Sequence, residues 1–141
     1  MMRNSGFTLL ELMVVLVILV LLAGLALPGY RDLVHKSRRS DARVSLSRVA
    51  LLQERYYLNV NRYAGDFAEL DASFASGNTI DSDAGHYALE LHPTDDGAGW
   101  TVVASAVDDQ KVDDACVRFL LDSHGTRTAF DGAGNTNLQC W

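Results

Sequence analysis

Residues 6–30 read GFTLLELMVVLVILVLLAGLALPGY, a run that is apolar at almost every position. Seventeen of the nineteen residues from 9 to 27 are apolar, and the exceptions are Glu11 and Gly24. As a helix, the 21 residues from Phe7 to Leu27 would extend about 31 Å, enough to cross the hydrocarbon core of a lipid bilayer. Because Arg3 carries its positive charge ahead of this run, we expect the N-terminus in the cytoplasm and the following chain across the membrane.

Charge is divided unequally between the two parts of the chain. The chain has 141 residues, of which 48% are hydrophobic and 21% charged, a composition typical of a folded protein. Residues 1–64 hold nine Lys or Arg and four Asp or Glu. Residues 65–141 hold three Lys or Arg and fourteen Asp or Glu, and the net charge of the whole chain is −6. Because phosphate binding needs clustered Lys and Arg, the acidic second part argues against a nucleic-acid partner.

Glu11 is an acidic residue near the start of the segment that we expect in the membrane. A carboxylate inside a membrane segment costs on the order of 3 kcal/mol on insertion scales. Glu11 therefore either lies at the membrane–water interface in contact with water, or it forms a pair with another charged group. Its place near a helix N-terminus also gives it a favourable interaction with the helix dipole.

The string GFTLLELMVVLVIL, which begins Gly6-Phe7-Thr8-Leu9-Leu10-Glu11, resembles the class III signal of type IV prepilins. The resemblance implies that a prepilin peptidase and methyltransferase cuts between Gly6 and Phe7, removes residues 1–6 as a leader and methylates Phe7. It also implies that Glu11 pairs with the N-terminal amine of a neighbouring subunit during assembly. Such a pair would offset the cost of burying either charge alone.

The helix is expected to continue beyond the membrane segment, to about Asn61. Pro28 has no N–H for the carbonyl of Gly24, which predicts a weak point in the helix at these two residues. Residues 30–64 contain no Gly or Pro. One set of residues recurs every three or four positions, a spacing typical of an amphipathic helix. The set is Ala42, Leu46, Val49, Gln53, Tyr57 and Val60.

Six cations follow the apolar run, namely Arg31, Lys36, Arg38, Arg39, Arg43 and Arg48. They form either a solvated stretch next to lipid or a set of contacts for the acidic heads of neighbouring subunits in a polymer. DNA binding by these six cations is the weaker hypothesis, because this stretch would lie inside a fibre.

The second part of the chain is predicted to be a small antiparallel sheet. Residues 65–85 are rich in Asp, Ser, Ala and Gly, which indicates a loop with one helical turn around Phe67–Leu70. The strand-like segments are His86–Leu91, Trp100–Ala106, Cys116–Leu121 and Thr126–Phe130. We therefore expect an α+β fold, in which three or four strands pack against the second half of the helix and residues 131–139 form a loop.

Cys116 and Cys140 are the two cysteines of the chain. They lack the spacing of a zinc site and form no CxxC motif. Outside the cytoplasm they would form a disulfide, and the alternative is two buried free thiols. A disulfide loop at the C-terminus resembles the D-region of pilins, and the segments QERYY at 53–57 and NLQCW at 137–141 resemble the PilE group of minor pilins.

The sequence offers no pattern of a catalytic, cofactor or metal site. The four histidines are scattered, at His35, His86, His92 and His124. The acidic segment 108–114 lacks the EF-hand pattern of calcium loops, and the chain has no P-loop or G-x-S-x-G motif. We expect no enzyme, no cofactor and no bound metal.

The resemblance implies a pilin with a leader at 1–6, a transmembrane and polymerisation helix at 7–28 and an extracytoplasmic head at 29–141. The expected function is that of a structural minor pilin, which passes once through the inner membrane and is then assembled into an extracellular type IV pilus. Expected partners are other major and minor pilins and the inner-membrane assembly platform. The alternatives are a DNA-binding receptor pilin and a pseudopilin of a type II secretion system.

Overall fold

The computed structural model describes the backbone of residues 8–74, 77–94 and 96–141, and the side chains of these residues except those of 25–28. Gly6 and Phe7 lie outside the described residues. By its internal contacts the chain divides into two compact units, Met1–Val34 and His35–Trp141. Each unit is described by itself.

Helix α1 extends from Leu9 to Val60 as one continuous element. At its start the hydroxyl of Thr8 accepts a hydrogen bond from the backbone N–H of Glu11 (3.2 Å). At its end Asn61 has a φ of 59°, and its N–H donates to the carbonyl of Tyr57 (2.8 Å). The backbone is helical at Gly24 and Pro28, so the weak point at these residues stays a prediction.

Among the described residues, α1 is the one helix that is long and apolar enough to cross a membrane. The large apolar side chains from Leu9 to Leu22 are exposed, with fractions between 47% at Val15 and 79% at Leu9. A helix that is apolar on every side is typical of a membrane segment.

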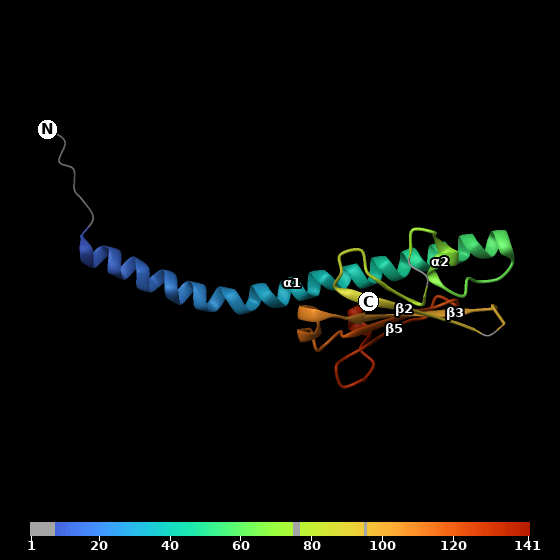
Figure 1. The fold of residues 1–141 in the computed structure, drawn as a ribbon. Helices are drawn as coiled ribbons and strands as arrows, with labels where there is room; N and C mark the ends of the chain where they lie inside the picture. Colours follow the sequence, from blue (N-terminus) through green and yellow to red (C-terminus); the bar gives the residue numbers. More distant parts are fainter. Residues whose placement is uncertain (1–7, 75–76, 95) are drawn as a thin grey trace. The chain divides into compact units, whose positions relative to one another are not determined.

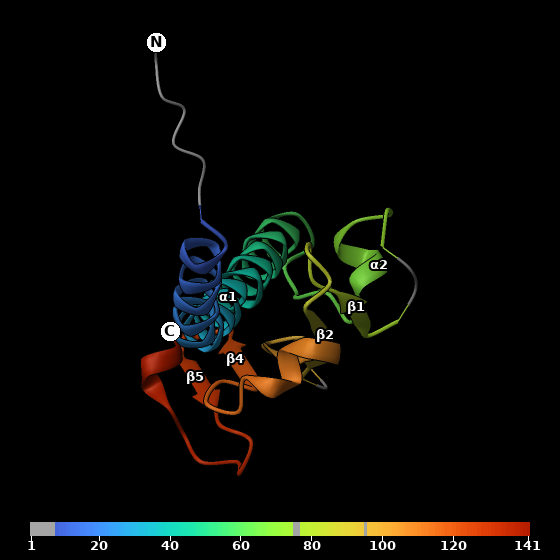
Figure 2. The ribbon, with the colours of Figure 1, turned by 90° about the vertical axis from the view of Figure 1, so that its left-hand side faces the viewer.

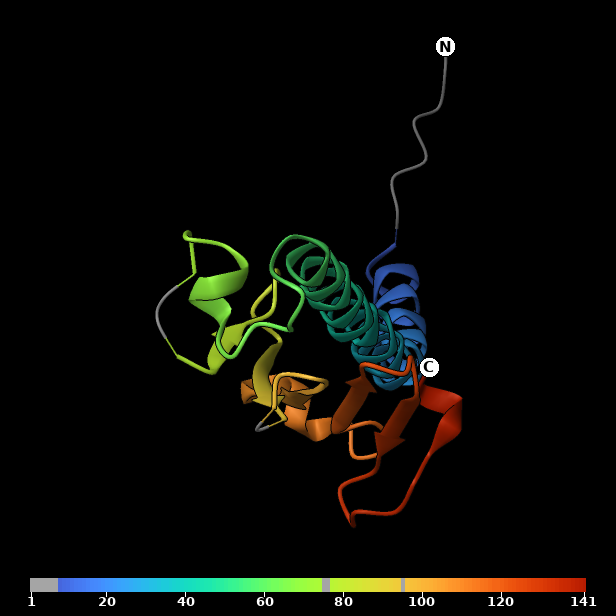
Figure 3. The ribbon, with the colours of Figure 1, turned by 90° about the vertical axis from the view of Figure 1, so that its right-hand side faces the viewer.

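The unit His35–Trp141 contains a five-stranded antiparallel sheet (Figure 1). Neighbours in space are also neighbours in sequence, in the order β1-β2-β3-β4-β5. The strands are β1 (Thr79–Asp81), β2 (Tyr87–Pro93), β3 (Trp100–Ala106), β4 (Arg118–Asp122) and β5 (Arg127–Phe130). The short helix α2 (Phe67–Leu70) and strand β1 lie at one edge of the sheet, and β5 lies with the C-terminal segment at the other (Figures 2 and 3).

The core of this unit lies between the sheet and the second half of α1. Alternate residues of β3 are buried, as expected for a strand with one face on a core. On the helix, Ala42, Leu46 and Val49 are almost fully buried and belong to the same cluster as Tyr87 and Phe119 of the sheet. The expected α+β architecture, with the second half of the helix on an antiparallel sheet, is confirmed.

The structure adds elements where the sequence predicts loops. Strand β1 lies within residues 65–85, and it pairs with β2 through Ile80 opposite Leu89. The predicted helical turn is present as α2, and at its start the side chain of Asp66 accepts a hydrogen bond from the backbone N–H of Glu69. In the predicted loop 131–139, Thr136 forms an isolated bridge with Phe130, and a 3₁₀ turn, η2, covers Leu138–Cys140.

Candidate functional site

The residues predicted to act in processing and assembly belong to the unit Met1–Val34. Gly6 and Phe7 are not described, so cleavage between them and methylation of Phe7 stay predictions. Glu11 is exposed in the first turn of α1. Its position near the helix N-terminus is as expected, whereas a favourable interaction with the helix dipole and its pairing with another subunit stay predictions.

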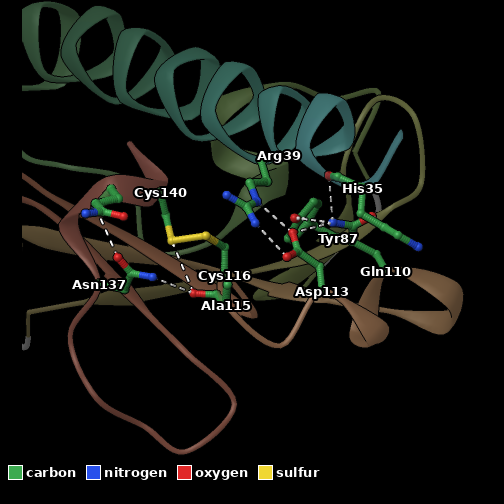
Figure 4. The surroundings of a disulfide bond; sticks show 10 residues. His35, Arg39, Tyr87, Gln110, Asp113, Ala115, Cys116, Asn137 and Cys140 are labelled. Atoms are coloured by element: carbon green, nitrogen blue, oxygen red, sulfur yellow. Dashed lines mark hydrogen bonds and ion pairs between the residues drawn. A yellow bond between two sulfur atoms is a disulfide. The ribbon is translucent and has the colours of Figure 1, made fainter. Parts of the chain in front are cut away.

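The disulfide between Cys116 and Cys140 is present in the structure (Figure 4). The two Cα atoms are 5.8 Å apart, and both residues are buried. Hydrogen bonds hold the same segment, because Asn137 donates from its side chain to the carbonyl of Ala115 (3.0 Å) and from its backbone to that of Ala129 (2.8 Å). The chain after β5 is thereby fixed to the residues that precede β4.

A buried polar network lies on the other side of Cys116 and attaches the 3₁₀ turn η1 (Asp108–Val112) to α1 (Figure 4). Arg39 donates two hydrogen bonds of 2.7 Å to Asp113. The amide of Gln110 donates to the carbonyl of His35 (3.2 Å) and to the hydroxyl of Tyr87 (3.1 Å). Burial raises the pKa of Tyr87 to about 12, so its hydroxyl is neutral at physiological pH.

Sequence analysis does not find this network, because Arg39 and Asp113 are 74 residues apart and belong to no motif. The acidic segment 108–114 is therefore partly engaged in an ion pair. Within the described ranges, no group of three or more His, Cys, Asp or Glu side chains could hold a metal ion.

Among the described residues of this unit, three arginines are paired with carboxylates. Besides Arg39 with Asp113, Arg48 lies 2.7 Å from Asp83 and Arg62 lies 3.0 Å from Glu69. These pairs join α1 or its end to the segments that follow. Their guanidinium groups are therefore already occupied by protein partners.

Arg118 and Arg127 have a different environment. The guanidinium carbon of Arg118 lies 5.7 Å from the centre of the Phe130 ring, and that of Arg127 lies 5.4 Å from the centre of the Trp141 ring. Both arginines are exposed. Across the described residues, neither lies within ion-pair distance of a carboxylate. They are the cations of the sheet that remain open to an external anion.

Comparisons with known proteins agree on the class of the chain. Residues 1–27 match the prokaryotic N-terminal methylation motif. The chain is similar to the type IV major pilin protein PilA of Myxococcus xanthus, with 38% identity over 47% of this chain and 30% of that protein. It is also similar to the type IV major pilin protein PilE1 of Neisseria gonorrhoeae, with 30% identity over 76% of this chain and 62% of that protein.

A similarity to a type II secretion protein accompanies those to pilins. The core protein G of Aeromonas hydrophila is 41% identical over 50% of this chain and 49% of that protein. The chain spans less than two thirds of the length of each of these three relatives. A type IV pilin from Shewanella oneidensis has the same fold, with a TM-score of 0.50, 27% identity, and coverage of 66% of this chain and 89% of that one.

A family model described as "Type IV minor pilin ComP, DNA uptake sequence receptor" matches residues 28–120. This family binds DNA. For the family, the expectation that nucleic acid is an unlikely partner is therefore wrong. That expectation rests on the net charge of residues 65–141, which does not report the local placement of single arginines. Because the match covers more than half of the chain, the protein belongs to the family of type IV minor pilins that includes the DNA uptake receptor ComP.

Proposed function

We propose that the protein is a DNA receptor that is displayed on a type IV pilus. The family match over residues 28–120 carries this proposal. It favours the receptor alternative over the purely structural role that the sequence first suggests. The exposed arginines of β4 and β5 support it, because they offer guanidinium groups that no described carboxylate occupies.

The affinity for DNA should depend strongly on salt. Residues 65–141 hold three cations and fourteen acids, so only a few phosphates can be neutralised there. Each neutralised phosphate releases counterions and contributes about 0.9 to the slope of log K against log salt concentration. We expect a slope of small magnitude and binding that is measurable mainly at low ionic strength.

Display on a pilus requires processing and membrane passage. Cleavage between Gly6 and Phe7 would remove the leader 1–6, and methylation would modify Phe7. The segment 7–28 would hold the subunit in the inner membrane, with the N-terminus in the cytoplasm and the head 29–141 on the other side. The intact mass of protein from sheared pili tests this step, because a chain that still carries residues 1–6 would contradict it.

Assembly needs a surface for other pilins. On α1, Val44, Leu51 and Leu58 recur at intervals of seven and are 59, 70 and 85% exposed. Apolar residues at this interval are typical of helix–helix contacts. They support the proposal that α1 contacts other pilins of the fibre in addition to its role in the membrane.

The receptor function is tested with the full chain in non-ionic detergent. Immobilised protein is incubated at low salt with sheared genomic DNA from the producing organism, mixed with an equal mass of foreign DNA. Sequencing of the retained fragments should show enrichment of the organism's own DNA around a recurrent short sequence. Retention of neither DNA would contradict the proposed function, and equal retention of both would reduce it to binding without sequence preference.

A further inference from the structure

We infer that Arg118 and Arg127 form a two-point clamp that holds double-stranded DNA by its phosphates. The two arginines are on opposite faces of the sheet, next to its edge strand β5. The inference rests on the proposed receptor function and names the residues that supply its affinity. It starts from the register of the two strands that carry the arginines.

The two arginines lie on opposite faces of the sheet. Arg118 is directly opposite Phe130, and Arg127 is directly opposite Leu121. Successive side chains of a strand point to opposite faces, and residues that are directly opposite share a face. Leu121 is buried on the face that packs under α1, so Arg127 belongs to that face and Arg118 to the outer one. Strand β5 is the last strand of the sheet (Figures 2 and 3), so the two arginines are on opposite faces of the sheet close to this edge.

An aromatic ring holds each guanidinium group. Arg118 lies over Phe130, and Arg127 over Trp141, whose own ring contacts Phe119 edge-on at 5.8 Å between centroids. A guanidinium over a ring keeps its charge and its N–H donors at the rim. Less side-chain entropy is then lost when a phosphate binds, so two such arginines can act where freely moving lysines would be weaker.

The carboxylates next to the clamp are engaged in their own turns. Asp122, at the end of β4, accepts the backbone N–H groups of His124 and Thr126 at 2.9 Å each. Asp131, directly after β5, accepts the backbone N–H of Asn135 at 2.8 Å. These contacts hold the two carboxylates in the turns, and neither forms an ion pair with Arg118 or Arg127.

The positions of the two arginines place them at different phosphates of a duplex. Arg127 and Phe130, the partner of Arg118, are three residues apart along β5, which is about 10 Å. Because the two side chains also leave opposite faces of the sheet, their guanidinium groups lie farther apart than this distance along the strand. They are too far apart to share one phosphate, so each would contact a different phosphate of the duplex. Since phosphates carry no sequence information, the clamp supplies affinity and orientation, and not the preference for a sequence.

The experiment measures binding of a labelled duplex by fluorescence anisotropy over a series of KCl concentrations, with the full chain in non-ionic detergent. Arg118→Ala and Arg127→Ala should each weaken binding about tenfold and reduce the salt slope by about one, equally for preferred and scrambled sequences. Arg118→Lys should retain the slope, because it retains the charge. Arg55→Ala is the matched control, since Arg55 is exposed on α1 and its replacement lowers the net charge by the same one unit.

The possible outcomes separate the clamp from the receptor function. If the wild type binds DNA and neither alanine variant differs from Arg55→Ala, the clamp is wrong and the receptor function stands. An effect of one arginine without the other also overturns a two-point clamp. If the wild type binds no DNA, both proposals fail. Circular dichroism melting of each variant excludes unfolding as the cause of a loss.

Discussion

Glu11 is the residue whose proposed role can be tested most directly. In Glu11→Leu the acid is lost from a segment that we place in the membrane, so insertion should be unchanged or improved. If Glu11 pairs with the amine of a neighbouring subunit, the substitution leaves that amine unpaired at a cost of about 3–5 kcal/mol. The variant should then be processed and stable in the membrane but depleted from sheared pili, as measured by immunoblots of both fractions.

Glu11→Gln is the control for size, because it retains the shape of the side chain and removes only the charge. It should be depleted from pili as strongly as Glu11→Leu. Wild-type amounts of either variant in sheared pili would contradict the pairing and leave the prepilin motif unaffected.

Asp113 should be among the most sensitive residues of the head. Its carboxylate accepts both hydrogen bonds from Arg39, and the two side chains are only 7 and 15% exposed. Asp113→Ala leaves the guanidinium buried without its partner, which should lower the free energy of unfolding by about 3 kcal/mol. Urea unfolding followed by circular dichroism measures the loss. In the exposed pair of Arg48 and Asp83, Asp83→Ala should cost less than about 1 kcal/mol, and equal losses would contradict the assigned role of burial.

At the scale of elements, the disulfide holds the segment after β5. In the chain-entropy model, a bond between residues 24 positions apart stabilises the fold by about 3–4 kcal/mol. Cys140→Ser should therefore lower the free energy of unfolding of the head by about 3 kcal/mol in urea. Reduction of the wild type should give the same value. A variant as stable as the oxidised wild type would show that the hydrogen bonds of Asn137 suffice.

The exposed apolar positions of α1 should matter for assembly and not for folding. Leu51 is 70% exposed, so Leu51→Glu should change the free energy of unfolding by less than about 0.5 kcal/mol. A charge in a helix–helix contact should nevertheless deplete the protein from sheared pili. Asn59→Glu adds the same charge at another exposed position of α1 and should assemble normally. Equal amounts of both variants in pili would contradict a role of this helix face.

The elements differ in how well sequence patterns predict them. Helix α1 and strands β2 to β5 are long enough to show a period, and the cap at Asn61 ends the helix within one residue of the expectation. Strand β1 has only three residues and pairs on one side, so the polar-apolar-polar order of its Thr-Ile-Asp sequence is too short to be told from a loop. It forms because β2 offers a free edge, a tertiary effect that local patterns do not contain.

On the scale of the whole head, stability should fall in acid. The hydrogen bonds from Arg62 hold the pKa of Glu69 below its usual value, and the backbone N–H of Asn135 does the same for the pKa of Asp131. With a lower pKa in the folded state, these groups stabilise the fold above their unfolded pKa and lose this contribution as pH falls. The melting temperature should be constant from about pH 7 to 5 and decline below about pH 4.

Calorimetry over this range of pH measures the decline. In Glu69→Gln the decline should be smaller, because one of the groups no longer titrates. A melting temperature that rises between about pH 5 and 3 would show that relief of repulsion among the acids outweighs these contacts.

The candidate site was predictable in part. The prepilin string and the two cysteines identify the class of protein, because both are local or countable features. The pairing of Arg118 with Phe130 and of Arg127 with Trp141 depends on strand register and on where the last residues return, and neither follows from composition. The net charge is an average over the surface, whereas the proposed DNA contact depends on where individual arginines lie.

The disulfide also determines how the head would carry a pulling load. Arg127 lies inside the covalent ring that Cys116 and Cys140 close, eleven residues from the first cysteine and thirteen from the second. Tension applied through a DNA molecule at Arg127 would therefore be shared by two parallel arms of the backbone, which meet again at Cys116. Neither arm can extend without the other, and unravelling of β5 would lengthen the tether by at most about 40 Å. Reduction would leave a single strand of chain to bear the whole force.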